Sequence, residues 1–310
     1  MQSLAQLNLS KSVMHQLLCL LALMPLVIGQ QALAQSDNNR SVEVTSADTF
    51  TAAKPAQRIV ALAPHIVEML FEIGAGDRIV ATVEYANHPA AAKAIPRIGN
   101  HAGVSMEKLL SYQPDLVLFW QGGNQAQDLA KMRSLGLNVR LSDPKALEDV
   151  AKELVMLGEL TGQTHIAQHR AEQFMAKLHH IEAQYQGKQA LSVFYQLWSA
   201  PLMTINQASW INQLITSCNA TNVFANAPTK TPQVSIENVL VAMPEVIVIP
   251  DASSAAGSKQ PDAGWQQWPQ IPAVKKQQII HTQGDVMHRF SSNMLTGLAD
   301  MCQQLDSFRE

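Results

Sequence analysis

Histidine and acidic side chains are the groups in this chain with the chemistry for metal binding or catalysis. His165 and His169 have the H-x-x-x-H spacing that places two imidazoles on one helix face, but no third zinc ligand lies nearby in the sequence. The stretch "GDVMHR" (284–289) adds a carboxylate, a histidine and an arginine, but the chain has no G-x-S-x-G, H-E-x-x-H or P-loop motif. We therefore expect no catalytic residue, no metal site and no enzymatic activity, with a secreted metal-dependent hydrolase as the alternative.

A repeated segment is the clearest internal pattern. "VSMEKLLSYQPDLVLFW" at 104–120 returns as "VSIENVLVAMPEVIVIP" at 234–250, an offset of 130 residues. In each copy a serine can cap a helix, a glutamate (Glu107 or Glu237) falls in its first turn, and a proline begins a strand. The helix dipole stabilises such a carboxylate by roughly 0.3–1 kcal/mol, which explains each glutamate on its own. The repeat indicates two similar units in one chain.

Strand and helix patterns must position these residues. Strands are expected at 58–64, 78–84, 114–120, 137–143, 189–198, 244–250 and 278–282, and a helix at 208–222. Strands that alternate with helices build parallel sheets. We therefore predict an α/β fold with two Rossmann-like lobes (56–144 and 188–310), joined by a helical linker (145–187) that includes one long backbone helix. A ligand cleft is expected between the lobes.

The N-terminus has the pattern of an export signal. Lys11 and His15 precede the apolar run "LLCLLALMPLVIG", and Ala-Leu-Ala then ends at Ala34. This order predicts a secretory signal peptide over 1–34, cleaved after Ala34, with an N-terminal membrane anchor as the alternative.

Charge and cysteine usage bound the partners and the compartment. The formal net charge is −3 and no basic block is present, so we expect no nucleic-acid partner. Cys218 and Cys302 are the cysteines that remain after cleavage. In an exported chain they suggest one disulfide, whose loop would stabilise the fold by roughly 4–5 kcal/mol, with two free buried thiols as the alternative.

Several stretches resemble one known family. They are "RIVALAPHIVEMLFEIGAGDRIVATVEYANHP" (58–89), "PDLVLFWQGGN" (114–124), "LGLNV" (135–139), "PQVSIENVL" (232–240) and "GDVMHRFS" (284–291). Together with the layout of two lobes and a long helix, they resemble the helical-backbone class (class III) of periplasmic binding proteins that feed ATP-driven importers. The W-x-G-G-N segment is most similar to the cobalamin-binding members of that class.

The resemblance implies a set of ligand-binding residues. Family aromatic positions match Tyr85 and Trp120 and, more loosely, Trp198 or Met203. A family Asp and Arg, four residues apart, match Asp285 and Arg289, which could instead form a local ion pair. Two family tryptophans are replaced, one by His101 or its neighbour and one by Thr231.

These residue types suit a corrinoid. Aromatic side chains can pack against its flat ring, and the Asp and Arg can bind its amides. Because the two repeats end differently, we expect Trp120 to enter the ligand cleft and Pro250 to stay outside it. Haem or a ferric siderophore is the alternative ligand, and with haem His101 or Tyr85 could ligate the iron.

The resemblance also implies a transport partner. Glu107 and Glu237 would dock onto a dimeric inner-membrane permease with ATPase subunits, because a two-fold symmetric partner offers the same surface twice. The implied location is the periplasm. The ligand is cargo, so no cofactor is expected.

Overall fold

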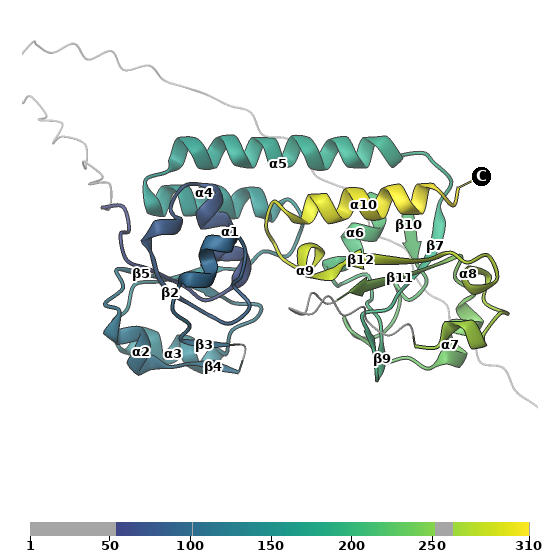
Figure 1. The fold of residues 1–310 in the computed structure, drawn as a ribbon, viewed down its shortest axis with the longest axis horizontal. Coiled ribbons are helices and arrows are strands. Elements are labelled where there is room, and N and C mark those ends of the chain that lie inside the picture. The colour runs from purple at the N-terminus through teal and green to yellow at the C-terminus, as the bar shows by residue number, and fades with distance from the viewer. Residues whose placement is uncertain (1–53, 101, 252–262, 310) are drawn as a thin grey trace, which may run out of the picture. The chain divides into compact units, whose positions relative to one another are not determined.

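The computed structural model describes residues 54–100, 102–251 and 263–309 (Figure 1). The expected signal peptide at 1–34 and His101 lie outside the described residues. Within those ranges, no helix is both long and apolar enough to cross a membrane.

Each lobe contains a four-stranded parallel sheet. In the N-terminal lobe the order is β2-β1-β5-β6, built from β1 (Ile59–Ala61), β2 (Ile79–Thr82), β5 (Leu116–Trp120) and β6 (Val139–Ser142). In the C-terminal lobe the order is β10-β7-β11-β12, built from β7 (Leu191–Tyr195), β10 (Ala220–Asn222), β11 (Val246–Asp251) and β12 (Ile279–Gln283). In each sheet, the strand that comes first in the sequence thus lies between the second and the third. The expected α/β fold is confirmed.

Helices cover both faces of each sheet because alternate strand residues point to opposite sides. In the N-terminal lobe, Ile59 and Ala61 share an apolar cluster with α1 (Pro64–Glu72), whereas Val60 shares another with α2 (Met106–Ser111) and α3 (Ala126–Ser134). In the C-terminal lobe, Val246 and Val248 share the first of these clusters with α6 (Ile211–Ser217) and α10 (Met294–Asp306). Ile247 and Ile249 pack with α7 (Ile236–Ala242).

Short elements complete both lobes. In the part of the chain that the structure describes, two short antiparallel pairs are present, β3 (Gly99–Asn100) with β4 (Gly103–Val104) and β8 (Trp198–Ser199) with β9 (Leu202–Met203). The remaining short helices are η1 (Gly76–Arg78), η2 (Ala90–Ala94), η3 (Trp265–Gln267), α8 (Pro272–Lys275) and α9 (Gly284–Met287).

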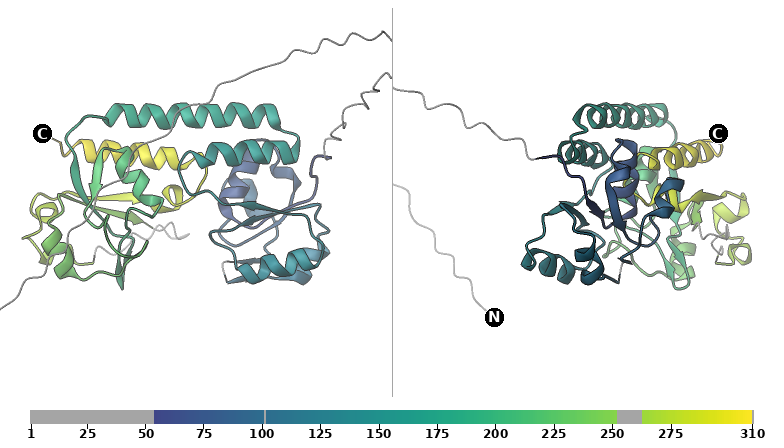
Figure 2. Two further views of the ribbon diagram at one scale, coloured as in Figure 1. Left: turned by 180° about the vertical axis from the view of Figure 1, so that it is seen from behind. Right: turned by 60° about the vertical axis from the view of Figure 1, so that its left-hand side comes forward.

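Two linker helices join the lobes. Helix α4 (Asp149–Thr161) ends at Gly162 in the left-handed conformation, and the 22-residue α5 (Thr164–Tyr185) follows. The buried residues of α5 recur every three or four positions and form one stripe: Ala167, Ala171, Phe174, Leu178, Ile181 and Tyr185. Helices α4 and α10 both contact α5, and the views in Figures 1 and 2 show them beside it. One apolar cluster therefore continues from the N-terminal lobe through the linker into the C-terminal lobe.

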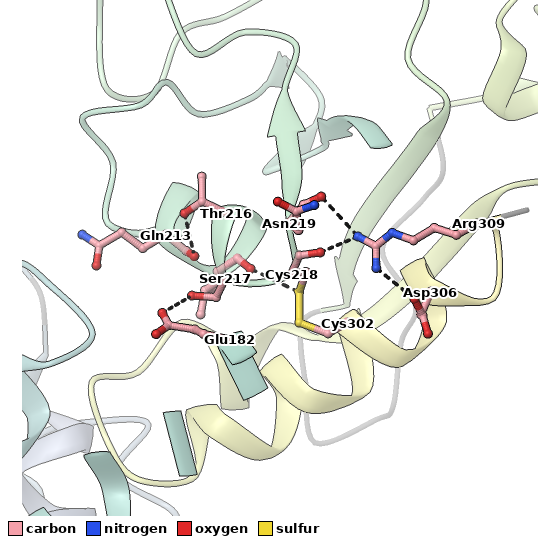
Figure 3. Close-up of a disulfide and its surroundings, with 10 residues drawn as sticks. Glu182, Gln213, Thr216, Ser217, Cys218, Asn219, Cys302, Asp306 and Arg309 are labelled. Atoms are coloured by element: carbon pink, nitrogen blue, oxygen red, sulfur yellow. Dashed lines mark hydrogen bonds and ion pairs between the residues drawn. A yellow bond between two sulfur atoms is a disulfide. The ribbon is translucent and has the colours of Figure 1, made fainter. Parts of the chain in front are cut away.

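A disulfide connects α6 to α10 (Figure 3). It joins Cys218, the residue that ends α6, to Cys302 within α10, and both residues are fully buried. The predicted pairing is confirmed. Beside it, the Ser217 hydroxyl donates to Glu182 of α5 at 3.0 Å, so α6 is tied to both helices.

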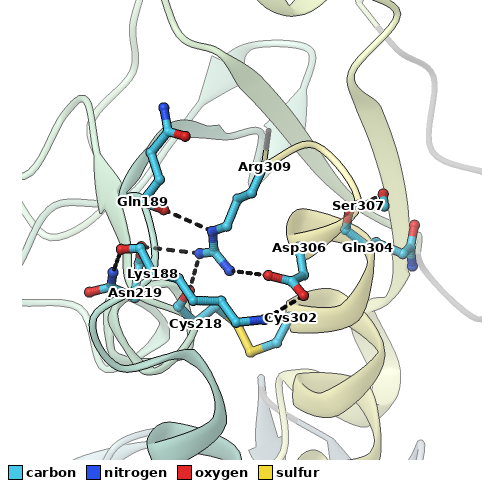
Figure 4. Close-up of polar contacts among 9 residues, drawn as sticks. All are labelled: Lys188, Gln189, Cys218, Asn219, Cys302, Gln304, Asp306, Ser307 and Arg309. Atoms are coloured by element: carbon cyan, nitrogen blue, oxygen red, sulfur yellow. Dashed lines mark hydrogen bonds and ion pairs between the residues drawn. A yellow bond between two sulfur atoms is a disulfide. The ribbon is translucent and has the colours of Figure 1, made fainter.

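The last turn of the chain is also fixed by polar contacts (Figure 4). The Arg309 guanidinium donates to the carbonyl oxygens of Cys218 and of Gln189, and pairs with Asp306 at 3.0 Å. Asp306 in turn pairs with Lys188 at 2.6 Å. These contacts hold the C-terminal end of α10 against the start of the second lobe.

One expected helix is shorter than its pattern. A helix was expected over 208–222, but α6 covers Ile211–Ser217 and the end of the segment is strand β10. Asn219 separates the two elements with a φ of 51°, a left-handed conformation that asparagine tolerates better than most residues. Residues 220–222 then pair with β7, so the sheet overrides the helical pattern.

The repeated segments occupy equivalent places in the two lobes. Ser105 caps α2 and Ser235 caps α7 through side-chain oxygens that accept from the helix backbone. The acidic residue after each proline also has the same role. Asp115 accepts from the backbone N–H of Arg58 at 2.9 Å, just before β1, and Glu245 accepts from the N–H of Ser192 in β7 at 2.8 Å. Much of the repeat therefore maintains the fold of each lobe.

Candidate functional site

The W-x-G-G-N segment fixes the orientation of Trp120. Asn124 accepts a hydrogen bond from the Trp120 backbone N–H at 2.7 Å and donates to the Leu62 carbonyl at 2.9 Å, which closes the loop after β5. The indole lies against Gly123, where a Cβ atom would come within 2.1 Å of Trp120 Cε3. His65 meets the indole edge-on with ring centroids 5.1 Å apart. These contacts therefore hold the Trp120 indole in one orientation.

His65 is a neutral buried histidine. Burial, followed by the nearby positive charge of Arg289, lowers the pKa of His65 to about 3. Its Nε2 atom lies 3.3 Å from the hydroxyl of Ser142. The histidine packs as an uncharged ring between Trp120 and Phe290, 6.3 Å from the latter, and does not add positive charge to the site at neutral pH.

Helix α9 places Asp285 and Arg289 beside the end of β11. Its first residue, Gly284, lies so close to β11 that a Cβ would be 2.7 Å from the Asp251 carbonyl oxygen. Arg289 lies 3.7 Å from Asp285, but its shorter contact, at 2.8 Å, is with Glu68 of α1. The expected local ion pair is thus the weaker of two, and Arg289 mainly joins the two lobes.

Glu68 receives three donors from the C-terminal lobe. Besides Arg289, the Ser291 hydroxyl donates to it at 2.6 Å and the Asn293 amide at 3.1 Å. The Glu68 side chain is only 5% exposed, so these bonds replace the water that a carboxylate requires. Sequence reasoning missed this residue. The signal was an acidic residue flanked by Val67 and Met69 in an apolar helix pattern, since a buried charge needs a partner.

Two cavities meet at Asp285. One, of about 350 Å³, is lined by Glu68, Asn87 and Arg289 among others, and therefore by both lobes. The other, of about 440 Å³, is lined by Trp198 and His288 among others. Asp285 lines both cavities. The structure therefore brings three expected site residues together: Trp198, Asp285 and Arg289.

Pro250 also lines the second cavity, together with Trp198 and Met203. It does so because β11 ends beside α9, so the last residues of the second repeat reach the same space as Asp285. The expectation that Pro250 stays outside the ligand cleft remains a prediction. Trp120 and Tyr85 do not line either cavity, and their ligand-binding roles stay predictions.

Two large exposed aromatic side chains lie at or close to these cavities: Trp198 lines the second one, and Tyr85 is close in sequence to a lining residue of the first. Tyr85 is 71% exposed and adopts a φ of 66°, two residues before Asn87 of the first cavity. Trp198 is 52% exposed, and its indole N–H donates to the Ala200 carbonyl at 2.9 Å, which fixes the β8–β9 turn. Exposed aromatic rings are suited to packing against a flat ligand.

The two repeated glutamates are exposed at the starts of their helices. Glu107 lies in the first turn of α2 and Glu237 in the first turn of α7. A hydrogen bond from Ser235 lowers the pKa of Glu237, so this carboxyl is charged at neutral pH. Leu110 on α2 and Val241 on α7 are exposed at 42% and 86%. Each helix therefore carries an exposed carboxylate and an exposed apolar side chain.

Metal-binding chemistry is not visible at this site. Among residues 54–100, 102–251 and 263–309, no group of three or more His, Cys, Asp or Glu side chains is arranged to hold a metal ion. The residues that line the two cavities instead offer the indole of Trp198, the Asp285 carboxylate, which lines both cavities, and the Arg289 guanidinium.

Comparisons with known proteins agree with this layout. Residues 59–286 match the family described as periplasmic binding protein. The chain is 33% identical over 252 residues to the vitamin B12-binding protein of Vibrio cholerae serotype O1, which covers 81% of this chain and 90% of the relative. It is 32% identical over 264 residues to the vitamin B12-binding protein of Vibrio campbellii, covering 85% and 94%.

Solved structures show the same fold. The crystal structure of the periplasmic vitamin B12-binding protein of Vibrio cholerae superposes with a TM-score of 0.75 at 32% identity, over 82% of this chain and 98% of that one. A periplasmic haem-binding protein in complex with two haems has a TM-score of 0.72 at 18% identity, over 81% and 98%, and at that identity it shares the fold alone. The chain belongs to the periplasmic binding protein family.

Proposed function

We propose that this protein captures cobalamin or a related corrinoid and delivers it to an ATP-driven importer of the inner membrane. The observation that carries the proposal is the position of Asp285 between two cavities, with Arg289 on one side and Trp198 on the other. The 32–33% identity to vitamin B12-binding proteins supports it. The protein binds and releases its cargo without chemical change.

The ligand class follows from the residues around the cavities. A corrin presents a broad apolar face and a rim of amide side chains. Trp198, with Tyr85 and Trp120 as further walls, supplies aromatic surface for the face. Asp285 accepts from amide N–H groups and Arg289 donates to amide carbonyls. His101 stays a predicted contact in place of a family tryptophan.

Titration calorimetry tests the ligand. We expect residues 35–310 to bind cyanocobalamin at a ratio of one to one, with a Kd below about 1 μM, and to bind haemin far more weakly. Preferential binding of haemin would favour the haem-binding alternative, and no heat with cyanocobalamin would contradict the proposal.

Docking onto a permease is the proposed role of Glu107 and Glu237. Both are exposed, lie at equivalent positions of the two lobes, and have apolar neighbours on the same helices. Reversal of both charges to lysine should abolish cobalamin-dependent growth while the purified variant binds cobalamin with unchanged affinity. Reversal of Glu159 and Glu172, exposed on the linker helices, changes the net charge equally and should leave transport intact. Normal growth of the first variant would contradict the docking role.

The proposed location is the periplasm, after removal of residues 1–34. N-terminal sequencing of the protein released by osmotic shock should begin at Gln35. A start at Met1 in the membrane fraction would instead indicate an N-terminal anchor.

A further inference from the structure

Tyr195 and His288 form a hydrogen bond beside the 440 Å³ cavity, which His288 lines. The Tyr195 hydroxyl lies 2.7 Å from His288 Nε2. Tyr195 is the last residue of β7 and is fully buried, whereas His288 follows α9 directly and lines the cavity. The hydroxyl is thus enclosed by protein while the imidazole reaches both the hydroxyl and the cavity.

The direction of this bond follows from the surroundings of the hydroxyl. Among the described residues, His288 Nε2 is the one hydrogen-bond partner of the Tyr195 hydroxyl. If Nε2 donated, the hydroxyl hydrogen would be buried without an acceptor, which is costly. Burial also raises the pKa of Tyr195, so the phenol keeps its proton. The hydroxyl therefore donates and Nε2 accepts.

The bond fixes the tautomer of His288. Burial lowers the pKa of His288 to about 4, against a smaller opposing effect of Asp285, so the ring is neutral at pH 7. A neutral imidazole whose Nε2 accepts must carry its hydrogen on Nδ1. Within the described ranges, Nδ1 has no hydrogen-bond partner in the protein. The buried polar atoms that lack a partner do not include Nδ1, so this atom is accessible from outside the protein. This N–H is therefore open to a ligand.

We propose that His288 is a ligand-contacting, specificity-determining residue that presents Nδ1–H to the cavity as a fixed hydrogen-bond donor, with Tyr195 as the positioning residue. Its partner is a carbonyl oxygen on the rim of the ligand, next to the amide whose N–H donates to Asp285. Neither ring nitrogen has a lone pair available for a metal, so His288 does not ligate cobalt or iron. The identity of the partner as a corrinoid amide rests on the proposed function.

The tautomer can be measured without any ligand. Long-range proton–nitrogen NMR of the ¹⁵N-histidine-labelled protein at pH 7 should show His288 protonated at Nδ1. The Tyr195→Phe variant should shift its signals toward the mixed tautomers of a free imidazole. A wild-type His288 protonated at Nε2 would overturn the inference, whatever the protein binds.

Affinity for cyanocobalamin tests the contact. Loss of one neutral hydrogen bond predicts that His288→Ala raises the Kd about three- to tenfold. His288→Asn, which keeps an N–H near the position of Nδ1, should stay within about twofold. An unchanged Kd in the alanine variant would refute the contact. If the wild-type protein does not bind cyanocobalamin, the proposed function fails while the NMR result still decides the tautomer.

Discussion

Substitution of Glu68 by glutamine should destabilise the protein more than any other isosteric change on α1. The glutamine keeps the volume but removes the charge and replaces one acceptor oxygen with an NH₂ group, which then faces Arg289, Ser291 or Asn293. Arg289 is only 15% exposed, so it would lose its main counter-charge in a poorly solvated position. Breaking a buried ion pair costs about 3–5 kcal/mol. Because Asp285 remains 3.7 Å from Arg289, we expect the lower end, about 3 kcal/mol.

Urea unfolding at pH 7 measures this cost. The matched control is Glu72→Gln, one turn later on α1, where burial raises the pKa of the carboxyl and removal of the charge should be neutral or slightly stabilising. Arg289→Gln should cost about as much as Glu68→Gln, and the double variant should cost less than the sum because neither charge is left alone. A Glu68→Gln protein within about 1 kcal/mol of the wild type would refute the role of this cluster in holding the lobes together.

Three further predictions follow from packing, titration and cross-linking. Gly123→Ala should displace the Trp120 indole and weaken cobalamin binding by roughly tenfold. The control Gly122→Ala, whose Cβ would stay 3.0 Å from the ring, should weaken binding less. Equal affinities of the two variants for cobalamin would argue against contact between Trp120 and the ligand. His65 is neutral when folded but titrates near 6.5 when unfolded, so it lowers the free energy of unfolding by up to about 1.4 kcal/mol per pH unit as the pH falls from 6.5 toward 3. In His65→Gln, the slope of the free energy of unfolding against pH should decrease by the contribution of about one bound proton. An unchanged slope would mean that His65 is charged when folded. Cys302→Ser opens a loop of 84 residues and should lower the free energy of unfolding by about 4.5 kcal/mol in calorimetry, whereas a loss below about 1 kcal/mol would show that the loop is restrained in the unfolded chain.

The fold was largely predictable because its signals are local. The alternation of buried strands and amphipathic helices, the caps at Ser105 and Ser235, and the stripe along α5 are all visible in the sequence. The boundary between α6 and β10 was not, because Ala220–Asn222 becomes a strand only through pairing with β7. The place of Pro250 in a cavity was not visible for the same reason, since it depends on which strand α9 lies beside.

The site was predictable in residue type but not in pairing. Asp285 and Arg289, four residues apart, suggested a local pair, whereas the main partner of Arg289 is Glu68, 221 residues earlier. The hydrogen bond between Tyr195 and His288 likewise joins residues 93 positions apart. Spacing along one helix can indicate contacts within that helix, but contacts between residues far apart in the sequence depend on how the elements pack within and between the lobes.

The position of cobalt in crystals grown with cyanocobalamin tests the central claim most directly. Diffraction data collected at the cobalt absorption edge locate the metal without reference to the protein structure. We predict a single cobalt site next to Asp285, within the space formed by the two cavities and between the lobes. Cobalt elsewhere on the protein, or no cobalt in crystals of a protein saturated with the ligand, would contradict the proposed binding site.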